Sequence, residues 1–160
     1  MLPFINDKLI IQPGKYCDAK SVTDGWSEFH QWYWAENNTY QASLDCLAWI
    51  RNKRASLLIS PITIQSDDLY EIWVKMFKGK KGSSLSFSIA DKNISNVINT
   101  QTDDEQFLWE KISDARFNAG NYQLIVSPGD ENSENVLAKV VILPKREMEK
   151  YKNWLIGNNL

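Results

Sequence analysis

The sequence predicts an all-β fold: a two-sheet antiparallel β-sandwich of the jelly-roll type, followed by a short C-terminal helix. The strongest observation is segment 70–77, where a period-two alternation separates two sets of side chains, Tyr70, Ile72, Val74 and Met76 against Glu71, Trp73, Lys75 and Phe77. This period is typical of a strand with one buried face. Segments 107–112 and 118–126 also read as strands. About eight to ten short strands at this spacing favour a sandwich over a parallel sheet.

The first half of the chain supplies short strand-like segments with turn signals between them. An apolar start at 9–12 is broken by Pro13 and Gly14, a turn dipeptide. An aromatic-rich stretch, 26–34, is followed by expected strands at 41–50 and 55–59, with a basic turn between them. Pro61 suits an edge strand or a β-bulge, because proline cannot donate a ladder hydrogen bond.

The second half alternates strands with polar connections. Residues 84–89 alternate serine with Leu85, Phe87 and Ile89, which predicts a strand with a core face and a polar face. We expect a loop over 96–106, a connection over 114–120 and a turn over 127–132. The last strand is expected over 136–143 and the helix over 145–155, with the helix's apolar stripe formed by Met148, Tyr151 and Leu155.

Length and composition point to one globular domain, 1–144, followed by a helix or linker, 145–160. A chain of 160 residues, 43% hydrophobic, can bury a full core without metal ions or several disulfides. No window approaches the roughly 18 uninterrupted apolar residues that span a bilayer, so membrane insertion is not expected. The N-terminus lacks the features of a secretion signal, and the chain could equally be a piece of a larger protein. A net charge of −2 with interspersed signs makes nucleic acid an unexpected partner.

The two cysteines, Cys17 and Cys46, are too far apart for a Cys-x-x-Cys pair, so zinc and dithiol redox chemistry have little support. A disulfide between them would stabilise the fold by roughly 3 kcal/mol on the chain-entropy model. Two buried free thiols are the equally weighted alternative, because only an oxidising compartment favours the bridge. Two glycosylation sequons, 37–39 and 93–95, fit an extracellular or extracytoplasmic location but also occur by chance.

Five segments in order resemble the jelly-roll carbohydrate-binding modules of families 6 and 35 and their galactose-binding-like relatives. The matching segments are Tyr70 to Lys75, Leu85 to Ile89, Trp109 to Ile112, Ala119 to Val126 and Val136 to Leu143. The resemblance covers roughly residues 55–143 and implies a lectin-like, non-catalytic accessory domain of a larger protein. It also implies that Trp109 matches a core tryptophan rather than a ligand contact.

The sequence departs from this family where a structural calcium ion is often held. The family often opens with an Ala-Glu pair and carries an aspartate in the last strand, whereas this chain has Ile11-Gln12 and Ala138-Lys139. The oxygen-rich, charged ligand set that calcium prefers is therefore missing at these positions. No cofactor is expected, and a structural calcium ion is not supported by the sequence.

The surplus of tryptophan points to sugar binding on exposed aromatics. Sugar sites combine a flat aromatic ring with groups that hydrogen-bond the hydroxyls. Seven tryptophans are present, and Trp73 and Phe77 lie opposite the apolar face of their strand. The alternative is that the aromatics fill the core, which is the commoner role of a tryptophan in a sandwich. Trp26 is the best exception because it follows Asp24-Gly25, and the candidate ligand-binding set is Trp26, Glu28, His30, Trp32 and Trp34.

Catalysis has little support, because His30 is the only histidine and has no recognisable catalytic partner. Two hypotheses remain. The first is a non-catalytic glycan-binding module that binds an oligosaccharide or polysaccharide and is tethered to other domains. The second is a structural or protein-interaction β-sandwich of a membrane or surface protein, with its aromatics buried and no sugar ligand. Exposed tryptophans would favour the first hypothesis.

Overall fold

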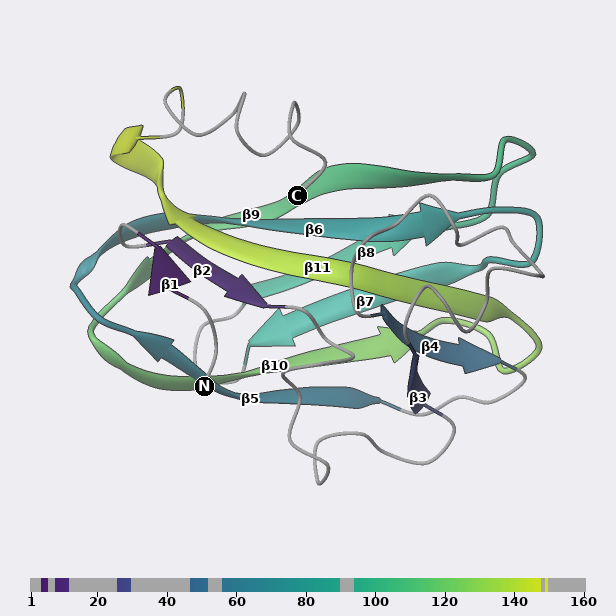
Figure 1. Ribbon diagram of the computed structural model, residues 1–160, viewed down its shortest axis with the longest axis horizontal. Helices are drawn as coiled ribbons and strands as arrows, with labels where there is room; N and C mark the ends of the chain where they lie inside the picture. The colour runs from purple at the N-terminus through teal and green to yellow at the C-terminus, as the bar shows by residue number, and fades with distance from the viewer. Residues whose placement is uncertain are drawn as a thin grey trace.

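The computed structural model describes residues 4–5, 8–11, 26–29, 47–51, 56–89, 94–147 and 149. Their strands form two antiparallel sheets that face each other (Figure 1), as the sequence predicts for an all-β sandwich. The inner faces meet in an apolar core that includes Ile72, Val74, Phe87 and Leu124, none of which is exposed to solvent. No helix of the described residues is long and apolar enough to cross a membrane.

The larger sheet is built around its longest central strands, which pair with each other in antiparallel register. Strand β11 (Glu134–Pro144) pairs on one side with β6 (Asp68–Lys78), which in turn pairs with β9 (Gln106–Phe117). On its other side β11 pairs with two shorter strands, each of which leads to one more short strand. These short strands are β1 (Phe4–Ile5) and β2 (Lys8–Ile11) at one end, and β3 (Trp26–Phe29) and β4 (Leu47–Arg51) at the other.

The smaller sheet has four strands and a simple edge-to-edge order. It runs β5 (Leu57–Ile64), β10 (Gly120–Pro128), β7 (Ser84–Ile89) and β8 (Ile94–Asn99). Pro61 lies in β5, at the edge, where the pairing with β10 skips from Ile62 opposite Tyr122 to Ile59 opposite Leu124. The skip sets two β5 residues against one β10 residue, which defines a bulge. Both features predicted for Pro61 are therefore confirmed.

Two segments expected to be connections contain strand instead. Residues 96–106 were expected to be a loop, but β8 continues to Asn99, with Ile98 buried and paired with Leu85. Residues 114–120 were expected to be a connection, but β9 continues to Phe117. The register of β9 shifts at Ile112, which reverses the inward and outward alternation of the following residues. The polar Asn96 at an inward position of β8, opposite Phe87, and this reversal in β9 both weaken the period-two signal.

A 3-10 turn, Lys145–Glu147, follows β11 where the short C-terminal helix is predicted. Apart from Glu149, the rest of the predicted helix lies outside the described residues. Salt bridges tie the turn to the large sheet, from Lys145 to Asp114 at 2.6 Å and from Arg146 to Asp68 at 2.6 Å. Lys111 extends this network, since its ammonium group lies 2.9 Å from both Asp114 and Glu71.

The charge network depends on pH through its carboxylates. Hydrogen bonds from Lys145 and Lys111 hold the pKa of Asp114 below its ordinary value of 3.8. A carboxyl group with a lowered pKa stabilises the folded state above its unfolded-state pKa, and this contribution is lost as the pH falls through the folded-state pKa. Asp114 therefore stabilises the protein at neutral pH and stops doing so in acid.

We expect Asp114→Asn to lower the free energy of unfolding at pH 7 by about 1 kcal/mol or less, because the pairs are partly exposed. The difference from the wild type should shrink towards zero as the pH falls below 3.8. Urea unfolding at several pH values measures both effects. The control is Asp103→Asn, which removes the same charge from an exposed loop. A difference between wild type and Asp114→Asn that is constant with pH would contradict this account.

Candidate functional site

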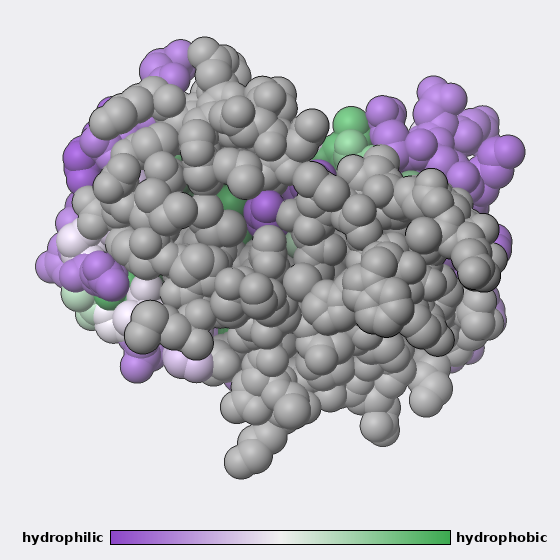
Figure 2. Space-filling view, in the orientation of Figure 1, coloured by the Kyte–Doolittle hydropathy of each residue, from purple (hydrophilic) through white to green (hydrophobic). Residues whose placement is uncertain are grey.

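Three connections between the two sheets meet at one end of the sandwich, at the right in Figure 1. They are residues 79–83 between β6 and β7, 100–105 between β8 and β9, and 129–133 between β10 and β11. Backbone hydrogen bonds join them, from Gly79 N to Thr100 O at 2.9 Å and from Glu134 N to Lys81 O at 2.7 Å. We call this region the loop end. Figure 2 shows hydrophilic side chains gathered around the β8–β9 connection, where residues 103–105 are exposed.

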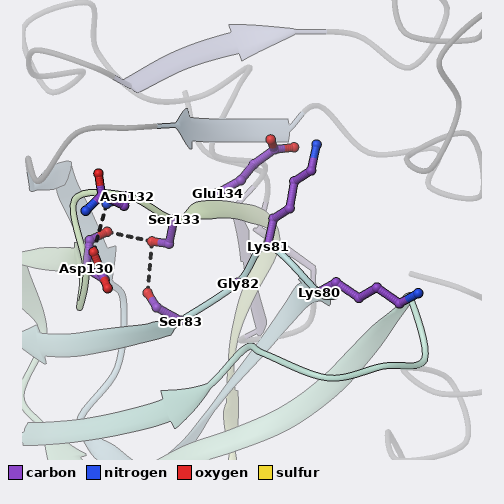
Figure 3. Close-up of a pocket in the computed structure, with 8 residues that line it drawn as sticks. All are labelled: Lys80, Lys81, Gly82, Ser83, Asp130, Asn132, Ser133 and Glu134. Carbon is purple, nitrogen blue, oxygen red and sulfur yellow. Dashed lines mark hydrogen bonds between the residues drawn. The ribbon is translucent and has the colours of Figure 1, made fainter.

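A hollow of about 400 Å³ lies between two of these connections (Figure 3). This volume falls at the lower end of the roughly 300–1,000 Å³ range of small-molecule sites. We call it the loop-end pocket, and its lining residues are Lys80, Lys81, Gly82, Ser83, Asp130, Asn132, Ser133 and Glu134. Every lining residue except glycine carries a polar side chain, which suits a polar ligand rather than an apolar one.

Buried and part-buried hydrogen bonds fix the floor of the pocket. The Thr100 hydroxyl donates to Asn135 Oδ1 at 2.5 Å, and Asn135 Nδ2 donates to Ser133 Oγ at 2.9 Å. Ser133 Oγ also accepts from Ser83 Oγ at 2.9 Å and donates to the Asp130 carbonyl at 2.6 Å. Thr100 and Asn135 are 0% and 1% exposed. We call this chain of contacts the buried network, and it connects all three loops.

Gly82 allows two of the loops to approach closely. A Cβ atom at this position would lie 2.3 Å from the carbonyl oxygen of Thr100, far inside normal contact distance. That oxygen belongs to the backbone and accepts a hydrogen bond from Gly79, so it cannot easily move aside. A glycine is therefore required here for the pocket wall to rest on the buried network.

The rim of the pocket offers ammonium, amide and carboxylate groups. Lys80 and Lys81 are exposed, and within the described part of the chain neither takes part in a salt bridge. Asp130 holds the turn, since its Oδ1 accepts from Asn132 N at 2.8 Å, while the side-chain amide of Asn132 stays at the rim. These groups can donate to and accept from the hydroxyls of a polar ligand.

The predicted ligand-binding residues are only partly within the described structure. Trp26 and Glu28 lie in β3, whereas His30, Trp32 and Trp34 lie outside the described residues. Cys17 and Cys46 also lie outside the described residues, so a disulfide between them stays a prediction.

The strand register places Trp26 at the same end of the large sheet as the pocket. Trp26 pairs with Ile50 of β4, and Ile50 pairs with Asn135 of β11, a member of the buried network. Neighbouring strands lie roughly 4.8 Å apart, so the backbone of Trp26 lies about 10 Å from that of Asn135. The backbone of Trp26 therefore lies near the loop end.

Other aromatic residues lie on the outer face of the large sheet. Trp109 is half-buried and pairs with Lys75, so it lies away from the core between the sheets, unlike the core tryptophan that it was expected to match. Phe77 packs edge-to-face on Phe107 at 5.3 Å between ring centroids, with the Lys75 ammonium 5.7 Å from the Phe107 ring. Trp73 is also half-buried. These contacts give Phe77 and Phe107 structural partners.

The sequence did not single out the residues of the pocket. It identified 127–132 as a turn, but it did not select Ser83, Asn132 or Asn135 as site residues. Serine and asparagine are ordinary turn residues, so their composition carried no functional signal. Among the described residues, no group of three or more His, Cys, Asp or Glu side chains could hold a metal ion.

Comparison with known proteins identifies the fold through structure alone. No protein-family model matches the chain, and no curated protein matches its sequence. Among solved structures, a family 6 carbohydrate-binding module of Cellvibrio mixtus lichenase 5A, in complex with cellotriose, has a TM-score of 0.57 and 16% identity. That match covers 85% of this chain and 96% of the module. The fold is thus that of the jelly-roll carbohydrate-binding modules, as the resemblance implied.

The same fold occurs as one part of longer proteins of different kinds. The GH26-CBM35 β-(1,4)-mannanase of Podospora anserina matches with a TM-score of 0.55 and 7% identity, over 88% of this chain but 28% of that chain. The mosquito-larvicidal Cry4Aa toxin of Bacillus thuringiensis matches with a TM-score of 0.57 and 14% identity, over 86% of this chain and 23% of that chain. The fold therefore serves more than one kind of protein.

We expect Thr100→Val to lower the free energy of unfolding by about 1–3 kcal/mol, because it leaves the buried Asn135 side chain without its donor. Thr63→Val is the control, since the Thr63 hydroxyl donates to Asn121 at 2.9 Å in an exposed site. Thr63→Val should change the free energy of unfolding by no more than about 0.5 kcal/mol. Denaturant unfolding of both variants gives the comparison, and equal effects would show that the buried network does not hold the loop end.

Proposed function

We propose that this protein is a non-catalytic glycan-binding module that binds an oligosaccharide or polysaccharide at the loop end of the sandwich. The observation that carries the proposal is the loop-end pocket, a hollow lined with polar groups on a hydrogen-bonded floor. A site whose groups are already fixed loses little conformational entropy when a ligand binds. The fold adds support, because similar structures include isolated carbohydrate-binding modules.

The chemistry of the pocket suits a sugar. Pyranose hydroxyls act as both donors and acceptors, and the rim presents Lys81, Asn132 and Glu134 to satisfy them. A sugar also presents apolar C–H surfaces that pack on aromatic rings. In this proposal Trp26 contributes such a ring at the border of the pocket, and its register position supports the assignment. Glu28, His30, Trp32 and Trp34 complete the proposed set.

The proposed setting is an accessory domain of a larger extracellular or extracytoplasmic protein. The mannanase match supports this setting, because there a domain of this fold occupies about a quarter of an enzyme chain. The turn Lys145–Glu147 is held to the sheet by ion pairs, which would fix the direction in which the chain leaves the domain.

A structural or protein-interaction domain is the competing function. The toxin match supports this competing function, because a sandwich of this fold also belongs to a protein whose name mentions no sugar. The competing function predicts no saturable sugar binding, whereas a glycan-binding module predicts binding that depends on residues of the loop end.

We expect the wild-type protein to bind members of a glycan array and to change its tryptophan fluorescence saturably when it is titrated with the sugars that bind. Trp26→Ala should weaken binding roughly ten- to hundredfold if the ring packs on the sugar. Asn132→Ala should weaken binding about two- to tenfold through the loss of a hydrogen bond.

The control for the asparagine variant is Asn118→Ala, which removes an exposed amide from the connection between β9 and β10, at the end of β10 opposite the loop end. It should leave the affinity unchanged, and circular dichroism should confirm that all three variants fold. If the protein binds no glycan on the array, the glycan-binding function is ruled out in favour of a structural or protein-interaction domain. Equal affinities for wild type, Trp26→Ala and Asn132→Ala would place any sugar site elsewhere.

A further inference from the structure

A second hollow, of about 470 Å³, lies on the outer face of the small sheet. Strand β7 turns Leu85, Phe87 and Ile89 into the core, so its alternate serines face outward. We call this hollow the face groove, and it is lined by Ser56, Ser84, Ser86, Val97, Ser127, Pro128 and Gly129.

The face groove combines hydroxyl groups with apolar walls. The hydroxyls of Ser56 and Ser127 lie 2.7 Å apart, and Ser86 Oγ donates to the carbonyl oxygen of Ser127 at 3.2 Å. Val97 is 63% exposed beside them, an unusual degree of exposure for a large apolar residue of the described structure. None of the lining residues carries a charge. Hydroxyls beside apolar surface suit a ligand that has uncharged hydroxyls and C–H faces.

The loop-end pocket and the face groove adjoin each other. Ser83 lines the first and Ser84 the second, and in the same way Asp130 lines the first and Gly129 the second. Consecutive Cα atoms are about 3.8 Å apart, so the two hollows are separated by little more than one residue's width. The boundary between them is formed where Gly129 N donates to Ser84 O at 3.0 Å.

The boundary carries little side-chain bulk. Gly129 has no side chain, and a Cβ atom there would lie 2.1 Å from the hydroxyl oxygen of Ser84. Any larger residue at position 129 would therefore displace Ser84 or build a wall between the hollows. The glycine keeps the boundary low enough for a continuous ligand to cross it.

We infer that the loop-end pocket and the face groove form one path for an extended glycan chain, with the uncharged part of that chain in the face groove. The inference rests on the proposed glycan-binding function and adds the class of ligand. Each hollow alone has a volume near the lower limit for a small-molecule site, whereas the two together accommodate several sugar units. The preferred ligand is therefore a polysaccharide segment rather than a single terminal sugar.

The test measures affinity by calorimetry against two ladders of β-1,4-linked oligosaccharides, of glucose and of mannose, from two to six units. For a ladder that binds, we expect the affinity to rise about tenfold or more with length, as two or more further hydroxyl contacts form. Ser86→Arg fills the face groove with an outward-pointing side chain. It should remove the gain with length and leave disaccharide binding unchanged.

The control is Thr63→Arg, which adds the same side chain to an exposed position near the other end of the small sheet. It should keep the gain with length. Equal affinity for the shortest and longest sugars, or a gain that survives Ser86→Arg, would overturn the extended path while the proposed function stands. If neither ladder binds but the array yields other sugars, a length series of the sugar that binds replaces the ladders, and the same two results overturn the extended path. If no sugar binds at all, the proposed function fails with it.

Discussion

The loop end depends on one buried contact, the hydrogen bond between the Thr100 hydroxyl and the Asn135 side chain. Both residues are almost fully buried, and a buried polar group without its partner costs about 1–3 kcal/mol. Asn135 in turn donates a hydrogen bond to Ser133, and Ser133 accepts one from Ser83. Three loops that differ in sequence position by up to about fifty residues are thereby held in one arrangement. The pocket is a consequence of this arrangement and not of any single loop.

The outer face of the large sheet is less suited to bind a ligand. Glu71, Lys75 and Lys139 lie on that face of the two central strands, and all three are buried. Glu71 accepts from Lys111 at 2.9 Å, and the Lys75 ammonium lies beside the Phe107 ring. Buried charges that are already paired would have to give up their partners to receive a sugar. At the loop end and on the outer face of the small sheet, polar groups can contact a ligand without breaking a buried ion pair.

The sequence predicted the architecture well wherever one face of a strand is uniformly apolar. The alternation over 70–77 and 84–89 identified β6 and β7, and Pro61 marked both an edge and a bulge. Prediction failed in the second half of β9, where the bulge at Ile112 reverses the alternation. It also failed in β8, whose inward positions include the polar Asn96, which donates to the carbonyl oxygen of Ile112.

The candidate site was predictable to a smaller extent, for a physical reason. Trp26 could be proposed from its turn context because an aromatic ring has a recognised role in sugar binding. The pocket residues come from loops 79–83 and 129–133, and their side chains meet only because the two sheets bring the loops together. That proximity depends on strand order and register, which local patterns of residue type do not specify.

The central claim is that a sugar binds at the loop end. The most direct measurement is a titration of isotope-labelled protein with a sugar that binds on the glycan array, followed by amide chemical shifts in NMR spectra. We expect the largest changes at Ser83, Asn132 and Ser133, and little change at Asn118 and Gly120, at the opposite end of the small sheet. Saturable changes confined to that opposite end, or no changes at any sugar concentration, would contradict the account.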